Sequence, residues 1–225
     1  MLVKPIKARP LIGDIAAQRL WGKGTATPRV VDVLESTFPQ QRAFIEDPAK
    51  LKWALCTRRA AKSYSDGLAL AKAALEHPDL SCLYIGLTRE SAKRIMWKDV
   101  QFNESELSAK FPNGSVIYLV GADSNEDERQ KLLGQKFVLV VIDEAQAFGI
   151  DLRQLVYGVL KPAVADYRGT IVLTGTPGNL IKGLFFDVTN GREAGWSGHR
   201  WITHDNPYMA EQWAARPSGP GGLRQ

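Results

Sequence analysis

VLVVIDE, residues 138–144, is the stretch of sequence that decides the fold. Its five aliphatic residues show no alternation with polar residues, which is typical of a strand buried on both faces in a parallel sheet covered by helices. Asp143 and Glu144 would end that strand, and burying two carboxylates is costly unless they have a chemical role. In phosphate-handling sheets a metal-bound Asp and a water-activating Glu occupy this place. The alternative is a buried strand that ends in two solvated acids.

A second informative stretch, residues 56–63 (CTRRAAKS), joins a predicted strand at Leu51–Cys56 to a predicted helix at Lys62–Glu76. A phosphate-binding P-loop needs a turn of backbone N–H groups, a lysine that reaches the β- and γ-phosphates, and a hydroxyl that binds Mg²⁺. Lys62 and Ser63 supply the last two at a strand-to-helix junction. The alternative is a structural helix start preceded by a solvated basic turn.

The loop departs from the P-loop pattern because Ala61 stands where the pattern has glycine, and no glycine lies earlier in the loop. Alanine costs little there if its φ angle is negative, and more if φ has to be positive. Arg58 and Arg59 suit a polyphosphate, since a fixed guanidinium can bind phosphate oxygens with two hydrogen bonds.

A third stretch, residues 173–178 (LTGTPG), closes a predicted strand at 170–173. Small hydroxyl residues and glycines allow a tight turn close to a γ-phosphate, although an ordinary strand-end turn has the same composition. A glutamine just before the first predicted strand can pair with an adenine edge, which offers one donor and one acceptor.

Strands and helices alternate along the chain, which favours a mostly parallel sheet with right-handed crossovers. The predicted strands are Leu51–Cys56, 81–87, 115–120, Phe137–Ile142, 170–173 and 200–203, and the predicted helices are 38–45, Lys62–Glu76, 88–100, 151–160 and a last one after Pro207.

Composition sets further bounds. A chain of 225 residues can form one large α/β domain. The net charge of +5 permits an anionic partner such as nucleic acid, although the basic residues are not gathered in one run. No apolar run reaches the roughly 18 residues of a membrane span, and no signal peptide is expected. Cys56 and Cys82 lie in apolar segments, so we expect them to be buried and reduced. The three histidines lack metal-ligand spacing.

Together these stretches resemble the ATPase domain of a phage large terminase, the motor that packages DNA into viral capsids. The resemblance runs from about residue 38 to residue 208. It rests on the order of five features and on a sixth near the end: Gln40-Gln41, the loop ending in Lys62-Ser63, residues 81–88 with their helix, residues 138–146, Thr174-Gly175-Thr176, and Asp205-Asn206-Pro207.

The resemblance implies an α/β P-loop NTPase with a mostly parallel central sheet flanked by helices, of the additional-strand, catalytic-glutamate class. Residues 1–37 would form an N-terminal arm or small subdomain, 38–208 the P-loop ATPase domain, and 209–225 a C-terminal tail or the start of a linker. A complete large terminase also has a nuclease domain of RNase H type. We expect neither that domain nor nuclease activity in this segment.

The resemblance also implies which residues bind ATP. Gln41 would contact adenine, with Gln40 as the alternative, and Lys62 would bind the β- and γ-phosphates. Arg58 would face the γ-phosphate as a catalytic arginine. The full set of expected nucleotide-binding residues is Gln41, Arg58, Arg59, Ala60, Ala61, Lys62, Ser63, Thr174, Gly175 and Thr176.

For hydrolysis, Ser63 and Asp143 would hold Mg²⁺, while Glu144 would orient and deprotonate the attacking water. Residues 174–176 would report hydrolysis to the parts that grip DNA. Many relatives carry an arginine directly before the glycine that precedes the Asp-Glu strand, where it acts as a finger on a neighbouring subunit. Here Leu133 precedes Gly134, so Arg129 is the candidate finger, with Lys131 as another.

The resemblance implies double-stranded DNA, a small terminase subunit and a capsid portal as partners, with a homo-oligomeric ring when assembled and a monomer when isolated. The location would be the cytoplasm of an infected bacterial host, without a membrane. Two other interpretations stay open. One is a DNA-dependent ATPase of the helicase kind, because residues 143–146 (DEAQ) also resemble that family. The other is a non-hydrolysing nucleotide-binding module that serves assembly.

Overall fold

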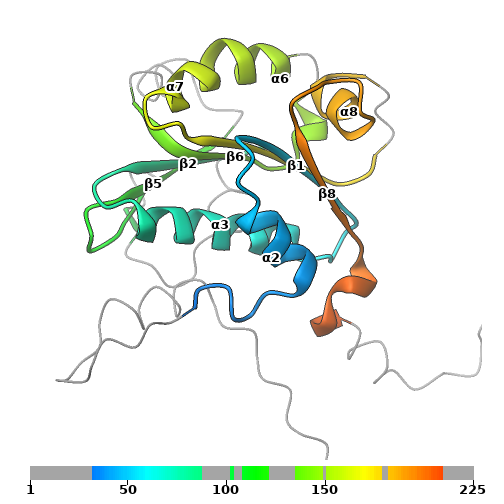
Figure 1. The fold of residues 1–225 in the computed structure, drawn as a ribbon, viewed down its shortest axis with the longest axis horizontal. Coiled ribbons are helices and arrows are strands. Elements are labelled where there is room, and N and C mark those ends of the chain that lie inside the picture. Colours follow the sequence, from blue (N-terminus) through cyan, green and yellow to red (C-terminus); the bar gives the residue numbers. More distant parts are fainter. Residues whose placement is uncertain are drawn as a thin grey trace, which may run out of the picture.

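An eight-stranded sheet runs through the part of the chain that the computed structural model describes, which is residues 32–87, 102–103, 108–121, 135–148, 151–178 and 182–209 (Figure 1). Its strands are β1 (Leu51–Cys56), β2 (Ser81–Gly86), β3 (Phe102–Asn103), β4 (Ser108–Lys110), β5 (Val116–Gly121), β6 (Phe137–Ile142), β7 (Thr170–Gly175) and β8 (Ser197–Trp201). The helices are α2 (Pro39–Glu46), α3 (Lys62–Glu76), α6 (Asp151–Gln154), the π-helix η2 (Leu155–Leu160), α7 (Lys161–Ala165) and α8 (Leu184–Thr189), with short 3₁₀ turns η1 (Ala145–Ala147) and η3 (Thr203–Asp205).

The strand order is β3-β4-β5-β2-β6-β7-β1-β8. The six strands from β5 to β8 in this order pair in parallel, whereas β3 and β4 pair antiparallel at one edge. β7 lies between β1, which leads into the phosphate loop, and β6, which carries the two acids. This insertion is the additional strand of the predicted P-loop class, and the predicted fold class is therefore confirmed.

Helices cover both faces of the sheet, with α2 and α3 on one side and α6, α7 and α8 on the other (Figure 1). The alternating side chains of β6 therefore enter two separate cores. Leu139 and Val141 belong to the α3 side, and Val140 and Ile142 to the α7 side. This two-sided burial explains the continuous apolar run in the sequence. All carboxyl ends of the parallel strands meet at one edge, where α/β sheets bind their ligands.

Three predicted elements match the structure in both bounds, namely β1, α3 and β6. The predicted helix 151–160 is instead a sequence of α6, η2 and α7 that continues to Ala165, while β3 and β4 were not predicted. The predicted helix 88–100 and most of the predicted N-terminal arm lie outside the described residues. Val33 and Leu34, at the end of that arm, are buried in the α3-side core.

Both cysteines are buried on strands, Cys56 at the end of β1 and Cys82 in β2, and both are free thiols. Burial raises the pKa of the Cys56 thiol and raises the pKa of Cys82 to about 12. Within the described ranges, no helix is both long and apolar enough to cross a membrane.

Candidate active site

The loop between β1 and α3 has the strand–loop–helix form of a P-loop, with two residues in the left-handed conformation. Arg59 and Ala61 have φ angles of 61° and 63°. Ala61 directly precedes Lys62, the first residue of α3. The left-handed conformation costs an L-residue such as alanine roughly 1–2 kcal/mol. Position 61 therefore does require the positive φ angle that favours glycine, and this alanine is strained.

Lys62 joins the two halves of the site. Its side chain is buried, and its ammonium donates hydrogen bonds to Asp143 and, at 2.9 Å, to Glu144 Oε1. Burial opposes the positive charge, but the nearby acids, Asp143 above all, outweigh it and raise the pKa of Lys62. The lysine thus stays charged beside the two acids at the end of β6, and its contact with phosphate stays a prediction.

Asp143 is the most heavily bonded side chain of the site. Its carboxylate accepts hydrogen bonds from Lys62, from Ser63 Oγ at 3.2 Å, from Tyr84 OH at 2.8 Å and from the backbone N–H of Glu144 at 2.8 Å. Burial acts to raise the pKa of Asp143, but the Lys62 ammonium and these donors lower it overall. Tyr84 was not predicted, and nothing distinguishes it within the apolar strand SCLYIG.

Asp66 is a second buried carboxyl that sequence reasoning missed. It lies one helical turn after Lys62 on α3 and is fully buried. Thr174 Oγ1 lies 2.9 Å from Asp66 Oδ2 and 3.0 Å from Asp143 Oδ1. Burial and then the charge of Asp143 raise the pKa of Asp66 well above its usual range. A protonated Asp66 can donate to Thr174, which leaves the single hydroxyl hydrogen of Thr174 for Asp143.

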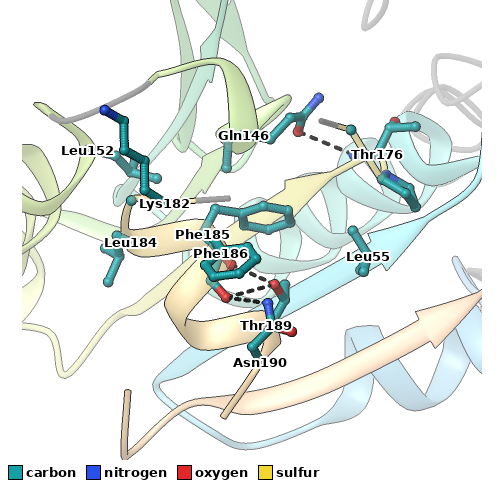
Figure 2. A pocket seen from close by; sticks show the side chains of 14 residues that line it. Leu55, Gln146, Leu152, Thr176, Lys182, Leu184, Phe185, Phe186, Thr189 and Asn190 are labelled. Carbon is teal, nitrogen blue, oxygen red and sulfur yellow. Dashed lines mark hydrogen bonds between the residues drawn. The ribbon is translucent and has the colours of Figure 1, made fainter. Parts of the chain in front are cut away.

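Glu144 is tied to the end of β7 through Gln146. Gln146 Nε2 donates to Glu144 Oε2, and Gln146 Oε1 accepts from the backbone N–H of Thr176 at 3.2 Å (Figure 2). A Cβ at Gly175 would lie 2.4 Å from Gln146 Oε1 and 2.6 Å from the Phe185 ring, so this close approach requires glycine. Beyond Gln146, a cavity of about 190 Å³ opens between this segment and α8. The predicted coupling segment therefore connects by contact to the predicted base.

The residues present fit a magnesium ion. Within the described ranges, no group of three or more His, Cys, Asp or Glu side chains could hold a metal alone. Mg²⁺ usually takes one or two carboxylates and completes its octahedron with water and phosphate oxygens. Ser63 Oγ and the Asp143 carboxylate, 3.2 Å apart, offer such a partial set.

Gln41 and Gln40 are placed differently from one another. Gln41 is fully buried, and its amide donates to Ala61 O at 3.1 Å and to Ser65 Oγ at 2.8 Å. Gln40 Nε2 donates to Asp205 Oδ1 at 3.2 Å. Gln41 thus links α2 to the last residue of the phosphate loop and to the first turn of α3. Contact of either glutamine with adenine stays a prediction, which for Gln41 requires the amide to leave these two partners.

The predicted arginines are only partly described. Arg58 and Arg59 are exposed on the phosphate loop, and Ala60 beside them is buried. Arg129, the predicted finger, lies outside the described residues. The structure therefore brings together Lys62, Ser63, Asp143, Glu144 and the segment 174–176, and it leaves the roles of the arginines as predictions.

The architecture and the site define an additional-strand P-loop NTPase fold. No protein-family model and no curated protein matches the chain. Among solved structures, the fold is similar to the large terminase ATPase domain of Thermus phage P74-26, with a TM-score of 0.55 and 16% identity over 80% of this chain and 88% of that one. It is also similar to the HK97 bacteriophage large terminase, with a TM-score of 0.55 and 16% identity over 83% of this chain and 42% of that one.

A third similar structure is the large terminase of a thermophilic bacteriophage in complex with ATP-gamma-S. It has a TM-score of 0.57 and 12% identity over 81% of this chain and 50% of that one. The chain thus spans most of the isolated ATPase domain and about half or less of the longer terminases. It has the fold of phage large terminase ATPase domains, as the sequence resemblance predicted.

Proposed function

We propose that this chain hydrolyses ATP and that the hydrolysis drives double-stranded viral DNA into a procapsid. The observation that carries the proposal is the meeting of Lys62, at the start of α3, with Asp143 and Glu144, at the end of β6. The buried Lys62 and Asp143 and the partly exposed Glu144 come from the two sides of the inserted strand β7 and converge at the carboxyl edge of the sheet. A polyphosphate would share the lysine with the two acids, which explains why the site keeps all three groups.

Each side chain has a distinct role in the proposed reaction. Lys62 binds the β- and γ-phosphate oxygens, and Ser63 with Asp143 holds Mg²⁺, which when bound neutralises charge that builds on the phosphates. Glu144 orients the attacking water and accepts its proton. Gln146 holds one oxygen of the Glu144 carboxylate, and the other, which here accepts from Lys62, becomes available to that water when Lys62 binds phosphate. Tyr84 and Thr174 fix the Asp143 carboxylate.

The motor function rests on the likeness in fold to large terminase ATPase domains and on the sequence resemblance. In the proposed assembly, copies of the chain form a ring on a capsid portal, with a small terminase subunit and double-stranded DNA as partners, in the cytoplasm of an infected bacterium. The hydrogen bonds from Glu144 through Gln146 to Thr176 end beside Gly175, which lies close to Phe185, and they offer a route by which hydrolysis could move α8. That route would connect ATP turnover to DNA movement.

Steady-state ATP hydrolysis with and without double-stranded DNA tests the proposal. We expect magnesium-dependent turnover that DNA stimulates. Glu144→Gln should lower the rate by about a hundred- to ten-thousand-fold while ATP still binds, because general-base catalysis contributes that much. Glu76→Gln is the matched control, since Glu76 is an exposed glutamate paired with a lysine at the far end of α3. Turnover of Glu144→Gln within twofold of the parent would refute the assignment of the base. ATP binding without any turnover in the parent would favour the non-hydrolysing assembly module.

A further inference from the structure

The outer side of the phosphate loop is bonded to one short segment from the end of the described chain. Three consecutive loop carbonyls accept hydrogen bonds from three side chains of that segment. Thr203 Oγ1 donates to Arg58 O at 2.7 Å, Asn206 Nδ2 to Arg59 O at 2.9 Å, and Trp201 Nε1 to Ala60 O at 2.8 Å. We name Trp201, Thr203 and Asn206 the clamp.

The clamp is itself held in place. β8 pairs in parallel with β1, so that Trp201 lies opposite Cys56, the last residue before the loop. Trp201 is buried against Phe44 of α2, with ring centroids 5.5 Å apart. The backbone N–H of Thr203 donates to Thr57 Oγ1 at 2.8 Å. The segment that holds the loop therefore starts at the end of β8, the strand that pairs with β1.

Asn206 is the most telling member because its polar side chain is buried. Only 3% of its surface is exposed, and its two polar atoms are both used. Nδ2 binds Arg59 O, while Oδ1 accepts from the backbone N–H of Tyr208 at 3.2 Å. Arg59 is one of the two left-handed loop residues, so the amide fixes the carbonyl at a strained position.

These contacts supply what the missing glycines would otherwise supply. A P-loop binds phosphate when its N–H groups turn inward, which requires its carbonyls to turn outward. Glycine reaches the left-handed angles of such a turn without strain, whereas Arg59 and Ala61 do not. Donors placed outside the loop favour the same outward carbonyls. In this chain hydrogen bonds from outside the loop thus take the place of the backbone freedom of glycine.

We propose that the clamp holds the phosphate loop in its anion-binding conformation, so that nucleotide affinity depends on docking of the segment 201–206. This inference rests on the proposed function, because it assumes that the loop binds a nucleotide. Coupling between two sites is reciprocal. Nucleotide binding must therefore stabilise the docked segment in return. Clamp residues are positioning residues, since they contact the loop and not the substrate.

The test is titration of the full chain with a fluorescent ATP analogue. Asn206→Ala and, separately, Thr203→Val should each weaken binding by about tenfold, equivalent to 1.4 kcal/mol. The control is Asn113→Ala, which also removes an amide bonded to a backbone carbonyl, here Ala74 O at 2.8 Å at the opposite end of α3. It should bind within twofold of the parent even if it melts earlier. Nucleotide should also slow amide hydrogen exchange in the segment 201–206.

A rescue experiment separates positioning from general damage. Ala61→Gly relieves the strain at the loop without touching the clamp, so it should return Asn206→Ala to within about threefold of parental affinity. No rescue by Ala61→Gly would overturn the proposed mechanism, and parental affinity in both clamp variants would overturn the proposal itself. If Asn206→Ala fails to fold, Thr203→Val decides.

Lys62→Ala distinguishes failure of the clamp proposal from failure of the proposed function. When the parent binds nucleotide and Lys62→Ala does not, the nucleotide site is in the assigned place. The affinities of the clamp variants then test the clamp proposal alone. When the parent itself binds no nucleotide, the proposed function fails first, and the clamp proposal fails with it.

Discussion

Replacing Ala61 with glycine should raise the melting temperature of the protein. The φ angle of 63° at this position costs alanine roughly 1–2 kcal/mol, which glycine does not incur. Against this, glycine gives the unfolded chain more freedom, worth about 0.4–1 kcal/mol. With the middle of each range, the net gain is about 0.8 kcal/mol. For a chain of this size, 1 kcal/mol shifts the melting temperature by about 2–4 °C, so we expect a rise of about 1–4 °C.

Ala60→Gly is the control for Ala61→Gly. Ala60 is buried and has no positive φ angle. Glycine there loses a buried methyl group worth about 0.8 kcal/mol and also gives the unfolded chain more freedom, so both effects lower the stability. Its melting temperature should fall by about 3 °C or more. Thermal unfolding followed by circular dichroism measures both variants without nucleotide. If Ala61→Gly melts at or below the parent, position 61 is not strained, and the account of the glycine-free loop is wrong.

Three further predictions follow from the same site. Lys62→Ala should abolish nucleotide binding and also lower the free energy of unfolding by about 3–5 kcal/mol, because it leaves Asp143 buried without its main partner; urea unfolding measures this, and unchanged stability would contradict the ion pair. In the parent, folding raises the pKa of Asp66, so the stability that protonated Asp66 contributes is present below the unfolded-state pKa of about 4 and is lost as pH rises towards the folded-state pKa. Asp66→Asn cannot titrate, so its free energy of unfolding should rise relative to that of the parent over this pH range. A stability difference that stays constant between pH 5 and pH 8 would exclude this. If Arg129 is a finger that acts between subunits, mixing Arg129→Ala with Glu144→Gln at high concentration should recover ATPase activity that neither shows alone; no recovery, while parental specific activity rises with concentration, removes Arg129 from that role.

The central fold was predictable because its signals are local. β6 is an uninterrupted apolar run, and α3 begins after the loop and ends at His77-Pro78, so both had clear bounds. The edge strands gave weaker signals. β4 has only the three residues SAK, and β8 has the sequence SGHRW with one large apolar residue, Trp201, so neither shows the apolar run that marks a central strand.

The site was predictable only as far as its motifs reach. Lys62, Ser63, Asp143 and Glu144 carry recognisable spacing, and the structure brings them together. Asp66 and Tyr84 do not, because a polar residue within a helix or strand reveals its burial only after the chain folds. The clamp is separated from the loop by most of the chain, and Asp205-Asn206-Pro207 was its only trace in the sequence. The sign of φ at Ala61 likewise depends on tertiary contacts.

The two buried cysteines allow local unfolding of the sheet to be measured through the reactivity of their thiols. A thiol with a raised pKa and no solvent access reacts with alkylating reagents only when the strand around it is exposed. Cys56 ends the strand that enters the phosphate loop, while Cys82 lies in β2, on the other side of β6 and β7. The rate at which each thiol is modified therefore times the opening of a different part of the sheet. A dye attached to a new surface cysteine would, for the same reason, label that position with little background.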